Sequence, residues 1–140
     1  MTKVTKEMRD QWRIEYEQQK AAEKLIVDTL LAEEEMLDED GYPTIAAETV
    51  VSLWPWEDKK GWFLFIESIW HLRSWGWHES TEPKDYPKDK TVQRFDISTA
   101  GWSGNESLIR AMEKNSFMWA TTWVQSRRGG HYIFEIDNDE

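Results

Sequence analysis

The stretch SRRGGHY, residues 126–132, brings together side chains that could bind an anion. Arginine offers a forked pair of N–H donors that fits a phosphate, and glycine lets backbone amides approach a ligand closely. Trp123, four residues before Arg127, would add a flat surface on which a ring can stack. These residues predict a site for a small anionic ligand, such as a nucleotide.

The glycines of this stretch also predict a β-hairpin, which is a purely structural alternative. A Gly129–Gly130 pair with positive φ fits a two-residue type I′ turn. Because side chains alternate along a strand, Trp123, Arg127 and Tyr132 would then share one face of the sheet. The expected cross-strand pairs are Arg128–His131, Arg127–Tyr132 and Gln125–Phe134.

A second glycine-containing turn, GWSGNES at residues 101–107, leads into a predicted helix. Ser103 and Glu106 have the spacing of a capping box, in which each side chain bonds the backbone amide of the other residue. Free amides at a helix N-terminus can also hold an anion. The candidate ligand-binding residues are therefore Trp102, Ser103, Asn105, Trp123, Arg127, Arg128, His131 and Tyr132.

Patterns typical of catalysis are weak in this sequence. His71, His78 and His131 lack a metal-site spacing such as H-E-x-x-H, so we expect no metal site. The carboxylates lie in acidic runs or near helix starts, and none is isolated with a partner in an apolar stretch, as general acid–base catalysis would require. We predict no catalytic residue and no cofactor, and a metal-dependent hydrolase that uses the histidines is the remaining catalytic alternative.

The elements that must position these residues follow a helices-then-sheet order. Good helix formers run without Gly or Pro through residues 4–38, which predicts one long helix. The other expected elements are helices at 45–54 and 57–72, strands at 74–80 and 91–99, a helix within 100–115, and strands at 116–126 and 131–137. This order predicts an α+β fold, with a small antiparallel sheet, one inserted helix and a C-terminal β-hairpin. We expect residues 1–40 to form a long, partly projecting N-terminal helix and residues 41–140 to form a single α+β domain.

Composition narrows the classes of function. A net charge of -10 over 140 residues argues against binding duplex DNA, because neutralising phosphates needs clustered Lys and Arg. The chain has no cysteine, which excludes disulfides and thiolate metal sites. No stretch is long and apolar enough to span a membrane, so we expect a cytoplasmic protein. Ten tryptophans exceed what so small a core can readily bury, so some are expected at the surface.

The N-terminal helix has two features that suit contact with a protein. Val4, Met8, Trp12 and Tyr16 recur at every fourth position, which indicates either a projecting helix end or a strip for a partner helix, including that of a homodimer. The acidic run EEEMLDED, residues 33–40, could bind a basic host protein or mimic the charge of a nucleic acid. An acidic protein–protein inhibitor is therefore an alternative function.

Four motifs occur in a fixed order: WPWED at 54–58, GWHE at 76–79, GWSGNES at 101–107 and SRRGGHY at 126–132. Together they resemble a group of small uncharacterised proteins encoded by tailed bacteriophages, over residues 45–136. The resemblance implies a setting, the cytoplasm of an infected bacterium, and no known activity. It implies a non-catalytic accessory protein that modulates host or defence processes, and we expect it to act by binding the small anionic ligand.

Overall fold

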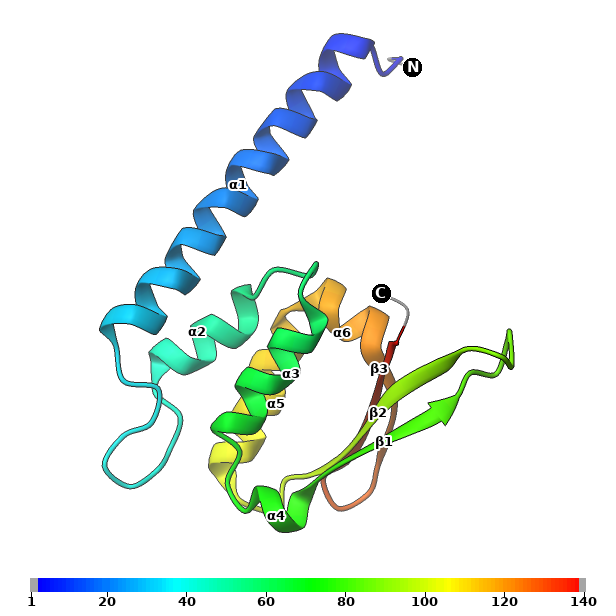
Figure 1. The fold of residues 1–140 in the computed structure, drawn as a ribbon. Helices are drawn as coiled ribbons and strands as arrows, with labels where there is room; N and C mark the ends of the chain where they lie inside the picture. The colour runs from blue at the N-terminus through cyan, green and yellow to red at the C-terminus, as the bar shows by residue number, and fades with distance from the viewer. Residues whose placement is uncertain (1–2, 139–140) are drawn as a thin grey trace.

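A computed structural model describes residues 3–138 and shows the predicted α+β fold (Figure 1). The elements are α1 (Lys6–Glu33), α2 (Ile45–Leu53), α3 (Lys59–Ser68), α4 (Arg73–Gly76), β1 (Trp77–Pro83), β2 (Thr91–Ser98), α5 (Ser103–Lys114), α6 (Ser116–Thr122), β3 (Trp123–Arg127) and β4 (His131–Asp137). The long first helix, the helices that follow and the C-terminal hairpin are confirmed.

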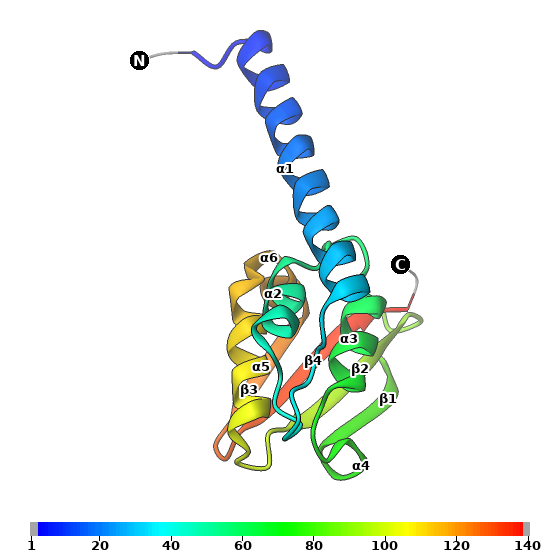
Figure 2. The same cartoon turned by 90° about the vertical axis from the view of Figure 1, so that its left-hand side faces the viewer.

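The four strands form one antiparallel sheet in the order β1-β2-β4-β3. Helices α3 and α5 lie on one face of this sheet, and in the described part of the chain no helix covers the other face (Figures 1 and 2). Phe63 of α3 stacks on Phe95 of β2, with 4.1 Å between the ring centroids. Trp62 is fully buried beside it, and its Nε1 donates to the Val51 carbonyl at 2.9 Å. The core therefore lies between these helices and the sheet.

Tryptophans are divided between this core and the surface, as expected. Trp62, Trp70 and Trp77 are buried, whereas Trp12, Trp75 and Trp123 are exposed. Each buried indole N–H has a hydrogen-bond acceptor: the carbonyls of Val51 and Ser98 and the carboxylate of Glu79. Burial of so polar a ring is tolerated because its N–H is satisfied.

Helix α1 ends earlier than predicted, because most of the acidic run at 33–40 forms a loop that is held by its own hydrogen bonds. The backbone becomes extended at Glu34, which follows the last helical residue. One Asp38 oxygen accepts hydrogen bonds from the amides of Asp40 and Tyr42, both at 2.9 Å. The Thr44 hydroxyl donates to the Glu35 carbonyl at 2.7 Å. The run is therefore a folded loop that is partly tied down, and the prediction of helix to residue 38 is wrong.

Two strand predictions are also wrong in part. Residues 116–122 form α6, although their aromatic and β-branched side chains favour a strand. Met118 and Thr122, one helical turn apart, are both buried, and the Thr122 hydroxyl donates to the Met118 carbonyl at 2.7 Å. This tertiary burial outweighs local propensity. The strand expected from residue 74 begins at Trp77 instead, because Arg73–Gly76 form the short helix α4.

Candidate functional site

The C-terminal hairpin does not have the predicted register. Gly129 and Gly130 both have positive φ, of 90° and 77°, as expected for a turn. The strand pairs, however, are Arg127–His131, Ser126–Tyr132, Gln125–Ile133 and Trp123–Phe134, with a bulge between Trp123 and Gln125. Arg128 therefore belongs to a three-residue turn, and the expected two-residue type I′ turn is wrong. A physical reason lies in the neighbouring loop, because the amide of Thr99 donates to the Gly130 carbonyl at 3.0 Å and holds this glycine in the turn.

This register separates the arginine from the aromatic rings. Tyr132 and Trp123 face the helices and contact the Trp119 ring, at 6.3 and 6.4 Å between centroids. Arg127 and His131 pair on the opposite face of the sheet. The predicted single face carrying Trp123, Arg127 and Tyr132 is therefore wrong.

The uncovered face of the sheet carries both acidic and basic side chains. Asp96 of β2 lies between two basic groups: its carboxylate is 3.2 Å from Arg94 Nε and 3.6 Å from His131 Nε2. Arg127 Nε lies 3.5 Å from the Gln125 side-chain oxygen. A carboxylate at the centre of the cluster disfavours a second anion there, because like charges repel at short range.

The three candidates from GWSGNES have structural tasks. Asn105 is fully buried and joins two loops: it accepts from the His71 amide and donates to the His71 carbonyl, both at 3.0 Å. Trp102 is sandwiched between Tyr42 and His71, with ring centroids at 4.6 and 4.2 Å. Ser103 is the first helical residue and Trp102 is the cap, without a side-chain cap bond. The predicted capping box is therefore wrong.

Apart from Trp123, which begins β3 at the other end of the strand, both groups of candidates nevertheless lie at the same end of the domain. Thr99, just before the GWSGNES turn, bonds Gly130 of the hairpin and accepts from Asn105 Nδ2 at 3.4 Å. A Cβ at Gly130 would overlap the Thr99 hydroxyl, so close packing accounts for this glycine. Gly76 of the GWHE motif likewise packs against the Ser98 carbonyl. Three of the four motifs therefore meet at this end, and close packing accounts for much of their pattern.

The three histidines have separate environments. His71 stacks on Trp102, His78 Nε2 lies 2.7 Å from the Trp75 carbonyl, and His131 faces Asp96. Across residues 3–138, no group of three or more His, Asp or Glu side chains is placed to hold a metal ion.

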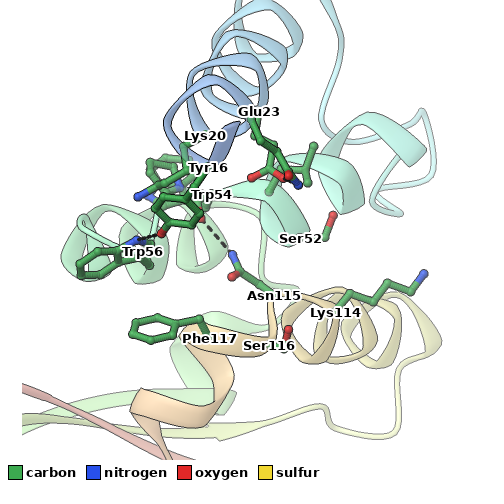
Figure 3. Close-up of a pocket in the computed structure, with 13 residues that line it drawn as sticks. Tyr16, Lys20, Glu23, Ser52, Trp54, Trp56, Lys114, Asn115, Ser116 and Phe117 are labelled. Carbon is green, nitrogen blue, oxygen red and sulfur yellow. Dashed lines mark hydrogen bonds between the residues drawn. The ribbon is translucent and has the colours of Figure 1, made fainter. Parts of the chain in front are cut away.

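A hollow lies at the opposite end of the domain, beside α1 (Figure 3). We call it the notch; its volume is about 300 Å³. It lies between α1, the loop from α2 to α3 and the junction of α5 and α6. Its lining includes Tyr16, Lys20, Trp54, Trp56, Asn115 and Phe117. The sequence reasoning missed Trp56 and Phe117 as surface residues, because WPW was interpreted only as a helix break.

One wall of the notch fastens α1 to the domain through a pair of contacts. Trp56 Nε1 donates to the Tyr16 hydroxyl at 3.2 Å. Lys20 forms an ion pair with Glu57, and its Nζ lies 4.7 Å from the centroid of the Trp56 ring. A cation over an indole face is attracted by the ring. The hydrogen bond from Lys20 also holds the pKa of Glu57 below its ordinary value.

The floor of the notch is fixed by Asn115, at the junction of α5 and α6. Its side-chain amide donates to the Val51 carbonyl at 3.1 Å and to the Trp54 carbonyl at 3.0 Å. These bonds connect the α5–α6 junction to the WPW turn. The notch is therefore held by hydrogen bonds on two sides.

The rim of the notch exposes aromatic rings. Tyr16 and Phe117 are each 54% exposed and Trp56 is 38% exposed, and Trp56 and Phe117 make an edge contact at 5.2 Å. Trp12, one helical turn before Tyr16, is 51% exposed. Large aromatic side chains that remain in water mark a surface suited to binding.

Helix α1 continues well beyond the notch and stands clear of the domain (Figures 1 and 2). We call its residues 6–15 the overhang. Of the 28 residues of α1 only Val27, in the half that packs on α2, is buried. Met8 and Trp12 of the predicted stripe lie exposed on the overhang, and Tyr16 lies at its base. In residues 3–138 no helix is both long and apolar enough to cross a membrane.

No protein-family model, curated protein or solved structure matches this chain. The function is therefore inferred from the geometry.

Proposed function

We propose that this protein is a non-catalytic accessory protein that binds another protein through the overhang of α1. The observation that carries the proposal is the exposure of Met8, Trp12 and Tyr16 on one side of a helix that buries only Val27. A helix whose apolar side chains recur at four-residue steps can lay that side into an apolar groove of a partner. In keeping with the phage resemblance, the partner is a host protein.

The rest of α1 holds the overhang in helical form before any partner binds. Residues 6–15 are too few to form a stable helix alone, because helices shorter than about 12–15 residues are marginal in water. The Thr5 hydroxyl caps the first turn by accepting from the Met8 amide at 3.1 Å. The contacts of Tyr16 and Lys20 hold the base of the overhang. The segment is therefore presented as a helix, which lowers the entropy cost of ordering it on binding.

Site-specific photo-crosslinking tests this proposal. Trp12 is replaced by photoreactive p-benzoylphenylalanine, and Leu64, an exposed residue of α3, carries the same group as the matched control. We expect position 12 to capture one host protein that position 64 does not capture. The captured protein is then purified, and Trp12→Ala should weaken its binding by about 2 kcal/mol or more, as for a buried aromatic anchor. Unchanged affinity would contradict the proposal.

A second copy of this chain is the competing partner. Light scattering on the purified protein distinguishes the two, because a homodimer has twice the mass of the 16.7 kDa chain. If the protein is a dimer and Trp12→Glu converts it to a monomer, the partner of the overhang is a second copy of this chain and not a host protein.

A further inference from the structure

The overhang carries a basic stripe beside its apolar one. Lys6, Arg9 and Arg13 follow one another at steps of three and four residues, so their side chains share one face of α1. Arg9 and Arg13 each come one residue after Met8 and Trp12, which places the two stripes side by side. All three basic residues are exposed. A surface that contacts the apolar stripe therefore also meets these charges.

The overhang and its lead-in differ in charge from the rest of the molecule. Residues 3–15, which are the overhang and the three residues before it, contain four basic and three acidic side chains, a net charge of +1. The whole chain has a net charge of -10, so the remaining residues carry -10 minus +1, which is -11. Asp10 offsets Arg13 only weakly, because their contact of 3.4 Å is exposed to water. The arm formed by residues 3–15 is thus slightly positive beside a strongly acidic body, and three of its four basic side chains lie on one face of α1.

We propose that the surface that receives the overhang is an apolar groove bordered on one side by Asp and Glu carboxylates of the partner protein. This inference rests on the proposed function and adds the charge of the partner. Arg9 and Arg13 can each donate two hydrogen bonds to a carboxylate while the Trp12 ring enters the groove. The receiving surface is therefore acidic along one border, and differs from the basic host protein that residues 33–40 suggested.

Two other anionic surfaces fit the observations less well. A lipid bilayer or a nucleic-acid duplex presents negative charge over a wide area, and the acidic body would be repelled beside it. An acidic groove concentrates its charge where the arm enters. The apolar stripe also needs an apolar floor, which the phosphates of a duplex do not provide.

A matched pair of synthetic peptides tests the inference on the full-length protein. Both peptides are amphipathic helices with the same leucine seam, flanked in one by glutamate and in the other by lysine, and both carry a fluorescent label. We expect fluorescence anisotropy to give a Kd about tenfold lower for the glutamate peptide at low salt, since opposite charges favour association. The difference should shrink in 0.5 M salt, where charges are screened.

Variants locate the effect on the arm. Arg9→Gln with Arg13→Gln should bring the Kd of the glutamate peptide close to that of the lysine peptide. The control, Lys88→Gln with Lys90→Gln, removes two exposed charges from the body and should leave both Kd values unchanged. Circular dichroism confirms that each variant is folded.

The outcomes separate this inference from the proposed function. If both peptides bind equally and Trp12→Ala abolishes this binding, the proposed protein binding stands and the inference of an acidic groove is overturned. Tighter binding of the lysine peptide, or no effect of the arginine changes, would also overturn it. Displacement of the glutamate peptide by phosphatidylserine vesicles or by duplex DNA at lower concentration than by unlabelled peptide would point to a lipid or a nucleic acid instead. Binding of neither peptide would overturn both proposals.

Discussion

The Trp56 indole donates a hydrogen bond to the Tyr16 hydroxyl at 3.2 Å, and this bond joins the turn between α2 and α3 to the long helix. Trp56 follows Pro55 in the turn after α2, while Tyr16 is the residue of α1 directly after the overhang. One indole therefore helps to set the direction in which the overhang leaves the domain. The Lys20 cation lies over the same ring, so two contacts of α1 depend on Trp56.

Trp56→Phe should loosen α1 without unfolding the domain. The change removes the donor to Tyr16 and keeps an aromatic ring, which corresponds to a loss of about 1 kcal/mol. Hydrogen exchange of the α1 amides near Tyr16 and Lys20 should become faster. Trp75→Phe, the same substitution at an exposed site, is the control. Equal exchange in the two variants would show that the bond does not hold the helix.

Glu57→Gln should remove a pH-dependent contribution to stability. The hydrogen bond from Lys20 lowers the pKa of Glu57 from its ordinary value of 4.5. The ion pair therefore stabilises the fold above that value, and its contribution is lost as the pH falls through the lowered pKa. The melting temperatures of the wild type and of Glu57→Gln should differ at pH 7 and converge in acid. Glu113→Gln, an exposed change on α5, should show no such convergence.

Glu67→Gln should have the opposite sign and stabilise the protein at neutral pH. Burial raises the pKa of Glu67, and the nearby Glu79 carboxylate adds to the rise. The charged form is therefore disfavoured in the fold, and the wild type gains stability as the pH falls through the raised pKa. The melting temperature of Glu67→Gln should exceed that of the wild type at pH 7, and the difference should fade in acid. A lower melting temperature at pH 7 would contradict this account.

Asn105→Ala should be strongly destabilising. The substitution leaves the partly buried amide and carbonyl of His71 without their partner, which costs about 3 kcal/mol. Ser107→Ala removes an exposed hydroxyl that bonds the Ser103 carbonyl in the same helix, and it should cost little. Urea denaturation measures both free energies of unfolding, and similar values would contradict the task assigned to Asn105.

Gly130→Ala should destabilise the hairpin more than Gly129→Ala. Both positions have positive φ, so either alanine suffers about 1 kcal/mol of backbone strain. Only at Gly130 does the added Cβ also overlap the Thr99 hydroxyl, whereas Gly129 faces open space. The difference between the two free energies of unfolding reports this contact. Equal losses would show that Thr99 does not confine the turn.

Periodicity and turn residues predicted most of the fold. The long helix, the helices that precede the sheet and the strand at residues 91–98 all lie where these patterns place them. Propensity failed at residues 116–122, because burial of Met118 and Thr122 is a property of the assembled domain. The end of α1 was misplaced because Asp38 and Thr44 act through hydrogen bonds across a loop, which no short window reveals.

The candidate site was harder to predict than the fold. A one-residue change of register moves Arg127 to the other face of the sheet, and Thr99, which bonds Gly130 in the turn, lies far away in the sequence. The stripe of Met8, Trp12 and Tyr16 was visible as a spacing. Its meeting with Trp56 and Phe117 was not, since that depends on how α1 crosses the domain.

The bulge between Trp123 and Gln125 also bears on the solubility of the protein. A regular edge strand is a template on which other chains can add strands and aggregate, and bulges, prolines and charges suppress this. The bulge interrupts the short edge strand β3, while β1, at the other edge, carries two glutamates and ends at Pro83. Both edges of the sheet thus resist strand addition, so a cell that makes much of this protein is protected from fibrous aggregates that grow from its sheet.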